Sequence, residues 1–184
     1  MTVREASIRK ATVADLQNLV LLENACFTSD RLTSRRFRHF IKNEQSELWL
    51  STSNTTGSDQ VNAYALMLFH RGTSLARLYS IAVSPDCRGQ GLAQALLEKV
   101  EERAIKHGVM FIRLEVKQDN ERALDIYQLA GYQKLRVLRE YYEDGADGWR
   151  LEKRLRPSVS SPQNLPFYAQ TTPFTCGPSA LLMA

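Results

Sequence analysis

The stretch at residues 78–107, LYSIAVSPDCRGQGLAQALLEKVEERAIKH, combines an apolar segment, a turn, a glycine-rich loop and an amphipathic helix. Residues 78–83 form a nearly unbroken apolar run, which is typical of a strand buried on both faces. Pro85 and Asp86 end that strand. From Leu92 onward apolar residues recur with helical spacing, and Gly108 follows as a helix-ending residue. The pattern predicts a strand, a glycine loop and a helix in direct succession.

The glycine loop Arg88-Gly89-Gln90-Gly91 lies at the expected N-terminus of this helix. Backbone N–H groups there lack intrahelical partners and the helix dipole is positive, so the site attracts phosphate. A Cβ at Gly89 or Gly91 would obstruct a pyrophosphate, and Arg88 adds a positive charge. An ordinary glycine turn is the alternative from spacing alone. The loop lacks the Gly-Lys-Ser/Thr of a P-loop, and Gln94 replaces the third glycine of a dinucleotide fingerprint.

The pattern Arg88-x-x-Gly91-x-Ala93 after an apolar strand resembles the acyl-coenzyme-A signature of the GNAT superfamily of N-acetyltransferases. Downstream residues resemble more narrowly the ribosomal-protein-alanine N-acetyltransferase branch: Leu114-Glu115-Val116, Asn120, Ala123, Tyr127, Gly131-Tyr132 and Tyr141-Tyr142. The resemblance covers residues 6–155. It implies an α/β (α+β) fold with a mixed, mostly antiparallel central sheet, helices on both faces and a β-α-β core that binds acyl-coenzyme A.

The same resemblance implies that acetyl-coenzyme A is the acyl donor and that a protein or peptide N-terminal amine attacks it directly, without an acyl-enzyme. The coenzyme-binding residues that it implies are Ile81, Ala82, Val83, Arg88, Gly89, Gln90, Gly91, Leu92, Ala93, Asn120 and Tyr127. Tyr127 would donate a proton to the coenzyme sulfur, whereas core packing is the alternative for such an aromatic residue. Asn120 would hydrogen-bond the pantetheine arm or simply cap the helix.

Glu115 is the candidate general base, because a carboxylate on the strand beside the central one can accept the amine proton, directly or through water. An ion pair with Arg113 or Lys117 on the same strand face is the alternative reading. Backbone N–H groups around Ala82 and Val83 would polarise the thioester carbonyl if the central strands splay apart.

Two further features concern the acceptor. Tyr141 and Tyr142 are expected to bind it, although alternation along one strand lets only one of them face the site. A predicted helix near residues 33–43 carries a cluster of arginines, Arg35, Arg36 and Arg38. In the superfamily this region borders the acceptor, so the cluster could meet an acidic acceptor. A solvated helix face is the favoured alternative.

The rest of the chain predicts a sheet that is antiparallel first and then crosses over to a parallel partner. The predicted strands are at residues 6–10, 47–52, 61–70, 78–83, 109–117, 133–143 and 149–156. The other predicted helices are at residues 12–24, opened by a capping box from Thr12 to Asp15, and at residues 120–130, ended by Gly131. Residues 53–60 are expected to form a turn.

Composition narrows the function classes. The chain has 184 residues, of which 43% are hydrophobic and 24% charged, as in a globular protein with a real core. No apolar run approaches the roughly 20 residues of a membrane helix, so we expect a cytoplasmic protein. Three widely spaced cysteines favour reduced thiols, and the absence of CxxC or HxxxH spacing makes a metal site unexpected. The net charge of +4 could favour polyanionic partners such as coenzyme phosphates or ribosomal surfaces, and a solvated basic surface is the favoured interpretation.

The C-terminal part has a different composition. Residues 157–166 predict a linker rich in Ser, Pro, Gln and Asn. The segment QTTPFTCGPSALLMA at residues 170–184 resembles the opening of a papain-like cysteine peptidase of the bacteriocin-leader-processing type. In such an enzyme Gln170 would help to form the oxyanion hole, and Cys176 would begin a helix that lowers its pKa. A peptidase also needs later His and carboxylate or Asn residues. We therefore expect an acetyltransferase domain at 1–156 and a truncated, inactive peptidase start at 167–184.

Together these observations predict an acyl-coenzyme-A-dependent N-acetyltransferase of protein or peptide N-termini, with no need for nucleic acid, membrane or metal. Two alternatives stay open. The acceptor could be a lysine side chain or a small-molecule amine, or the domain could be a non-catalytic coenzyme-A-binding module attached to a cysteine peptidase. The sequence does not indicate an oligomeric state.

Overall fold

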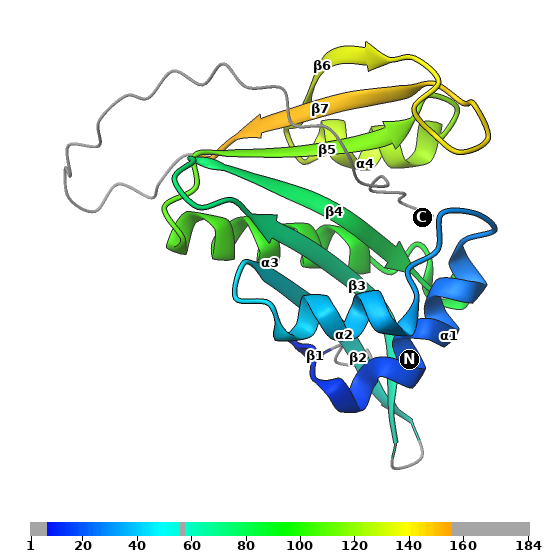
Figure 1. Ribbon diagram of the computed structural model, residues 1–184. Coiled ribbons are helices and arrows are strands. Elements are labelled where there is room, and N and C mark those ends of the chain that lie inside the picture. Colours follow the sequence, from blue (N-terminus) through cyan, green and yellow to red (C-terminus); the bar gives the residue numbers. More distant parts are fainter. Residues whose placement is uncertain (1–6, 56–57, 156–184) are drawn as a thin grey trace.

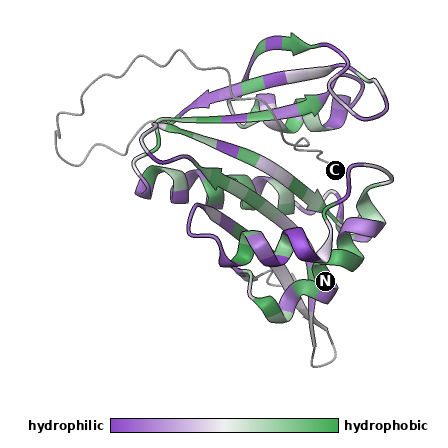
Figure 2. Ribbon diagram, viewed as in Figure 1, coloured by the Kyte–Doolittle hydropathy of each residue, from purple (hydrophilic) through white to green (hydrophobic). Residues whose placement is uncertain are grey.

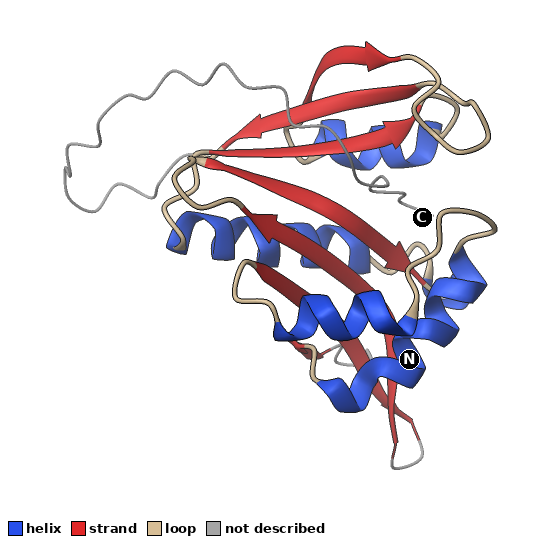
Figure 3. Cartoon of the chain, in the orientation of Figure 1, coloured by secondary structure: helices blue, strands red, loops and turns tan. Residues whose placement is uncertain are grey.

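A computed structural model describes residues 7–55 and 58–155, which form one mixed sheet flanked by helices (Figures 1 and 3). The elements are β1 (Ser7–Lys10), η1 (Val13–Asp15), α1 (Leu16–Cys26), α2 (Ser34–Lys42), β2 (Ser46–Thr55), β3 (Ser58–Phe69), β4 (Leu75–Val83), η2 (Pro85–Cys87), α3 (Leu92–Lys106), β5 (Phe111–Lys117), α4 (Glu121–Leu129), β6 (Gln133–Leu138) and β7 (Gly148–Arg154), η1 and η2 being single 3₁₀ turns. The strand order is β1-β2-β3-β4-β5-β7-β6. β4 and β5 run parallel and the other neighbours antiparallel. The predicted fold class is confirmed.

The sheet separates two apolar cores, because successive strand residues point to opposite faces. One core, which includes Met67, Leu96 and Leu114, lies under α3 and α4. The other, which includes Phe37 and Leu48, lies under α1 and α2. Hydropathy colouring shows β4 as a largely apolar strand between helices whose outer faces are polar (Figure 2). No helix within the described residues is long and apolar enough to span a membrane.

The strand predicted from the apolar run is confirmed. Residues Leu78 to Val83 of β4 are all at most 4% exposed, as expected for a strand covered on both sides. The predicted capping box is also confirmed, since the Asp15 carboxylate accepts hydrogen bonds from the Thr12 N–H at 2.8 Å and the Thr12 hydroxyl at 2.9 Å.

The predicted turn at residues 53–60 is wrong. β2 continues to Thr55 and β3 resumes at Ser58, and Ser53 pairs with Gln60 in the ladder between them. Ladder hydrogen bonds join backbone groups, so polar side chains in the arms of a projecting hairpin do not end the strands. Composition marked the location of the hairpin but overestimated the length of its turn.

The predicted strand at residues 133–143 is too long. β6 ends at Leu138, and Glu140 adopts φ +46°, in the left-handed region that interrupts an extended strand. Tyr141 and Tyr142 therefore lie in the loop between β6 and β7, where both of their N–H groups donate to the Ala146 carbonyl. The expectation that the two tyrosines alternate along one strand is wrong.

A buried carboxylate fixes the connection between α1 and α2. Glu23 is 2% exposed, and its two oxygens accept hydrogen bonds from the Leu32 N–H at 2.7 Å and from the Tyr64 hydroxyl at 2.5 Å. The same hydroxyl lies 2.7 Å from the Ser80 hydroxyl on β4. Burial raises the pKa of Glu23. The start of α2 is thereby held against the centre of the sheet.

A second buried carboxylate, Glu47 on β2, joins the sheet to the C-terminal end of α3. It accepts two hydrogen bonds from Arg103, at 2.7 and 2.9 Å, and one from the Trp49 indole at 3.0 Å. His107 lies 3.0 Å away and stacks on Phe69. Burial alone would raise the pKa of Glu47, but the hydrogen bonds from Arg103, His107 and Trp49 outweigh it and lower the pKa to about 2. The ionised carboxylate is therefore the form that stabilises the fold.

We predict that Glu47→Gln lowers the free energy of unfolding by about 1–2 kcal/mol at pH 7, because charge-assisted hydrogen bonds become neutral ones. The folded pKa is depressed, so this stabilisation is complete above the ordinary value of 4.5 and is lost as the pH falls toward about 2. Urea unfolding of both proteins at several pH values measures the difference. Glu44→Gln is the control, since Glu44 is 88% exposed. A difference that did not shrink between pH 5 and pH 3 would contradict this assignment.

Candidate active site

The loop between β4 and α3 has the geometry of an anion site. Gly91 is the N-cap of α3 and Gly89 precedes it, both at φ +76°, a conformation that favours glycine. Within the described residues no side chain caps α3, and a Cβ built on either glycine meets no atom within 4 Å. Among the described residues, the first N–H groups of α3 therefore have no side-chain cap, and the space beside the two glycines is open. The buried Nε of Arg88 also has no hydrogen-bond partner in the described part of the chain.

A cavity of about 520 Å³ opens beside this loop and extends between α3 and α4. Its walls are Val83, Cys87, Arg88, Gly89, Gly91, Leu92, Ala93, Gln94, Leu97, Glu98 and Glu101, together with Arg122, Asp125, Ile126, Leu129, Ala130 and Lys153. Most of the residues expected to bind coenzyme are therefore at one site. Ile81, Ala82, Gln90, Asn120 and Tyr127 do not line this cavity. An unpartnered guanidinium and free helix amides beside an apolar trough fit a phosphate-bearing ligand with a long apolar arm.

The central strands splay apart, which is the condition on which the expected Ala82 and Val83 donors depend. β4 and β5 pair at Leu75, Ala76 and Arg77, and the pairing recorded for the described residues ends where Arg77 lies opposite Arg113. Figure 1 shows the two strands diverging beyond this point. The Ser84 N–H donates to Asn62 on β3, so alternation directs the Val83 N–H to the opposite side, toward the opening. By the same alternation Ala82 faces β3, so Val83 is the better of the two candidate donors.

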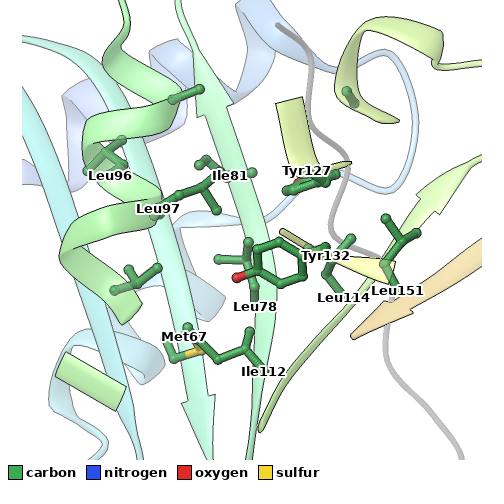
Figure 4. Close-up of a cluster of buried hydrophobic side chains, with 14 of the residues drawn as sticks. Met67, Leu78, Ile81, Leu96, Leu97, Ile112, Leu114, Tyr127, Tyr132 and Leu151 are labelled. Atoms are coloured by element: carbon green, nitrogen blue, oxygen red, sulfur yellow. The ribbon is translucent and has the colours of Figure 1, made fainter. Parts of the chain in front are cut away.

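Tyr127 of α4 lies behind the opening with its ring fully buried. Figure 4 shows Tyr127 and Tyr132 between the β4 side chains Leu78 and Ile81 and the side chains Leu114 and Leu151. Among the described residues the Tyr127 hydroxyl has no hydrogen-bond partner. Burial, and secondarily the nearby Tyr142 phenol, raise the pKa of Tyr127, so the phenol keeps its proton. A buried hydroxyl without a partner is costly, but the Tyr132 hydroxyl is in the same situation among the described residues, so this feature alone does not distinguish a proton donor from core packing.

Asn120 caps α4, because its side-chain oxygen accepts a hydrogen bond from the Ala123 N–H at 3.1 Å. The helix-capping interpretation is thus correct, and the expected contact with the pantetheine arm stays a prediction.

Glu115 is buried within the sheet and held by two arginines. Its side chain is 2% exposed, and its two oxygens accept hydrogen bonds from Arg77 Nε and Arg150 Nε, both at 2.9 Å. The alternative that Glu115 pairs with Arg113 or Lys117 is wrong, because Arg113 pairs with Glu152 and Lys117 with Asp144. The carboxylate lies two residues beyond the point at which β4 and β5 separate.

Tyr141 is joined to the same group. Its hydroxyl accepts a hydrogen bond from Arg77 Nη2 at 2.8 Å, and its ring meets that of Tyr142 edge to face, with centroids 5.4 Å apart. Tyr142 is 4% exposed and packs into the core under α1 and α2. Tyr141 is therefore the member of the pair that is positioned near Glu115.

Sequence reasoning missed Arg77 and Arg150. Arg77 could have been identified from the sequence, because it lies in the largely apolar strand β4, where a charged side chain is stable only with a partner of opposite charge. No local pattern identifies Arg150, since its position opposite Glu115 depends on the insertion of β7 between β5 and β6.

In the part of the chain that the structure describes, no group of three His, Cys, Asp or Glu residues could hold a metal ion.

Comparison with known proteins agrees with this geometry. The family model described as Acetyltransferase (GNAT) family matches residues 16–132, and the chain belongs to this family. A ribosomal protein bS18-alanine N-acetyltransferase of Escherichia coli is 40% identical over 67 residues, which is 36% of this chain and 45% of the relative. The match thus spans about half the length of that curated relative.

Solved structures resemble more of the chain. The crystal structure of the ribosomal-protein-alanine N-acetyltransferase from Escherichia coli has a TM-score of 0.72 and 25% identity, covering 88% of this chain and 99% of that one. The NatC complex bound to Gag peptide and CoA contains a chain with a TM-score of 0.73 and 20% identity, covering 83% of this chain and 99% of that one.

A second family model, described as Peptidase_C39 like family, matches residues 165–184. The segment includes Gln170 and Cys176, which lie outside the described residues. Their expected peptidase-like roles stay predictions.

We predict that Gly91→Ala weakens coenzyme A binding by about tenfold or more, because a Cβ would occupy the space that a pyrophosphate needs beside the α3 amides. Calorimetric titration measures the dissociation constant. Gly72→Ala is a matched control, since Gly72 has φ +74° and equally open surroundings but does not line the cavity. Both variants carry the same backbone strain, so equal affinities would contradict the phosphate site.

Proposed function

We propose that this protein transfers an acetyl group from acetyl-coenzyme A to the N-terminal amine of a protein or peptide. The observation that carries the proposal is the opening between β4 and β5, which has an anion site and cavity on the α3/α4 side and Glu115 on the α1/α2 side. Donor and acceptor can therefore approach the same gap from opposite faces of the sheet. Membership of the acetyltransferase family and the likeness to N-terminal acetyltransferases support the same reaction.

On the donor side, the α3 N-terminus and Arg88 would hold the phosphates, and the cavity would hold the remainder of the coenzyme. The bound thioester supplies an acyl group with a good leaving group. The Val83 N–H points toward the gap and is available to stabilise the oxyanion of a tetrahedral intermediate. Val83 is itself held in place, since its carbonyl accepts a hydrogen bond from the Cys26 thiol at 3.3 Å.

Direct attack by the amine fits the chemistry of this face better than an acyl-enzyme. Cys26 lies beside Val83, but burial raises the pKa of its thiol to about 11, so it is not a thiolate at neutral pH. Glu115 would take the amine proton, directly or through a water molecule. An α-amine has a pKa near 8, against about 10.4 for lysine, so a modest base is sufficient for an N-terminus.

On the α4 side, Tyr127 would donate its phenolic proton to the departing coenzyme thiolate. Its hydroxyl is buried and protonated, and it has no partner among the described residues that would have to be displaced. The raised pKa keeps the phenol protonated until the C–S bond breaks, while it also makes the phenol a weaker acid toward the thiolate, so we expect a modest catalytic contribution.

The proposed function is tested by incubating the protein with acetyl-coenzyme A and peptides that carry both a free N-terminus and an internal lysine. We expect tandem mass spectrometry to find acetyl groups mainly on the α-amine, for the pKa reason given above. Labelling mainly on lysine, or on added small amines alone, would refute N-terminal specificity. If coenzyme A bound tightly but no thiol were released with any amine, a purely binding role would replace catalysis.

The role of Tyr127 is tested with Tyr127→Phe, which keeps the ring but removes the hydroxyl. We predict that kcat falls by about 10²-fold, the lower part of the usual range for one acid–base group, while coenzyme affinity changes little. Tyr132→Phe is the matched control, because Tyr132 is also buried and its ring lies edge to face with that of Tyr127 at 5.7 Å. Steady-state rates at saturating acetyl-coenzyme A, with melting temperatures alongside, make the comparison. Equal kcat values for the two variants would assign Tyr127 to packing alone.

A further inference from the structure

The acceptor side of the opening carries a connected group of side chains that we name the arginine cluster: Arg36, Tyr79, Arg77, Tyr141, Glu115 and Arg150. Arg36 Nη2 donates to the Tyr79 hydroxyl at 2.5 Å. The guanidinium groups of Arg36 and Arg77 lie 5.7 and 5.5 Å from the centre of the Tyr79 ring. The cluster thus extends without a break from α2, across β4 and β5, to β7.

The charges in this cluster do not balance. Among the described side chains, Arg77 and Arg150 share one carboxylate, Glu115, and Arg36 adds a third guanidinium that is hydrogen-bonded to the neutral Tyr79 hydroxyl, so the described groups of the cluster carry more positive than negative charge. Within the described residues Arg36 forms no ion pair, and the only hydrogen bond that Arg150 makes there is with Glu115. The side chains of Arg77 and Arg150 are each 19% exposed, so a ligand can reach them.

Three carboxylates near the cluster, all within the described residues, have other partners. Glu23, on the same face of the sheet, has its pKa raised by burial and already accepts hydrogen bonds from Leu32 and Tyr64. Asp144 and Asp147, in the loop that carries Tyr141, pair with Lys117 and Arg139. Guanidinium groups held together in this way are an unfavourable arrangement unless an anion joins them.

The position of Arg36 separates it from its neighbours on α2. Arg35 and Arg38 are exposed, as expected for a solvated helix face, whereas Arg36 is half-buried and directed at Tyr79. The favoured sequence interpretation thus holds for two of the three arginines, and Arg36 is the exception that faces the acceptor side.

From this arrangement we infer that the acceptor is anionic: a peptide whose second residue is acidic, so that the carboxylate of this residue binds the arginine cluster. This inference rests on the proposed function and adds the class of acceptor. An amine that enters the gap beside Glu115 places its second residue within the cluster. A carboxylate there gains charge-assisted hydrogen bonds, whereas a lysine or arginine is repelled. The positive charges also lower the pKa of the incoming amine and so favour its neutral, nucleophilic form.

The test compares three C-terminally amidated peptides that differ only in the second residue: Asp, Asn or Lys. We expect kcat/KM for Asp to exceed that for Asn by about tenfold or more, with Lys lowest, as for the loss of a charge-assisted hydrogen bond. Arg36→Gln should reduce the Asp/Asn ratio severalfold, and Arg36→Lys should retain most of it. Arg35→Gln, one residue away on the solvated face, should leave the ratio unchanged.

The outcomes distinguish the two proposals. Acetylation of all three N-termini with no preference for Asp, or a preference that Arg36→Gln leaves intact, would overturn the inference while the proposed function stands. If none of the peptides is acetylated but free aspartate is, the acceptor is anionic and N-terminal peptide specificity fails. Acetylation of the Lys peptide in preference to the other two would overturn the anionic acceptor directly.

Discussion

The parallel pairing of β4 and β5 ends at Arg77 and Arg113, and the site depends on this interruption. Beyond it the facing edges of two buried strands carry backbone groups that the partner strand no longer satisfies. Such an edge is costly inside a core unless another molecule pairs with it. An extended ligand arm lying along β4, as the proposed function requires, would meet that requirement, so the same interruption of the sheet would both create the site and favour its occupation.

Each half of the opening is held by a separate set of interactions. On one face Glu47 ties α3 to β2 through Arg103, which fixes the helix whose N-terminus forms the anion site. On the other face Glu23 ties the start of α2 to the sheet and so places Arg36 over β4. Two buried carboxylates thus position the proposed donor and acceptor sides through separate sets of hydrogen bonds.

The sequence predicted the parts of the fold that depend on local pattern. The strand, glycine loop and helix at residues 78–107 follow from apolar spacing and glycine placement, and the anion site follows from them. The loop containing Tyr141 was misread because one left-handed residue, Glu140, ends a strand that composition would extend. The partners of Glu115 could not be found by pattern, because Arg150 reaches it only through the pairing of β7 with β5.

The two arginines that bind Glu115 hold its carboxylate in a fixed position beside the gap. In the proposed reaction their positive charge would lower the pKa of an amine bound beside them and so favour its neutral, nucleophilic form. An acidic second residue in the acceptor would offset part of the positive charge of the arginine cluster once the substrate is bound. Acceptor recognition and proton transfer would in this way depend on the same three arginines.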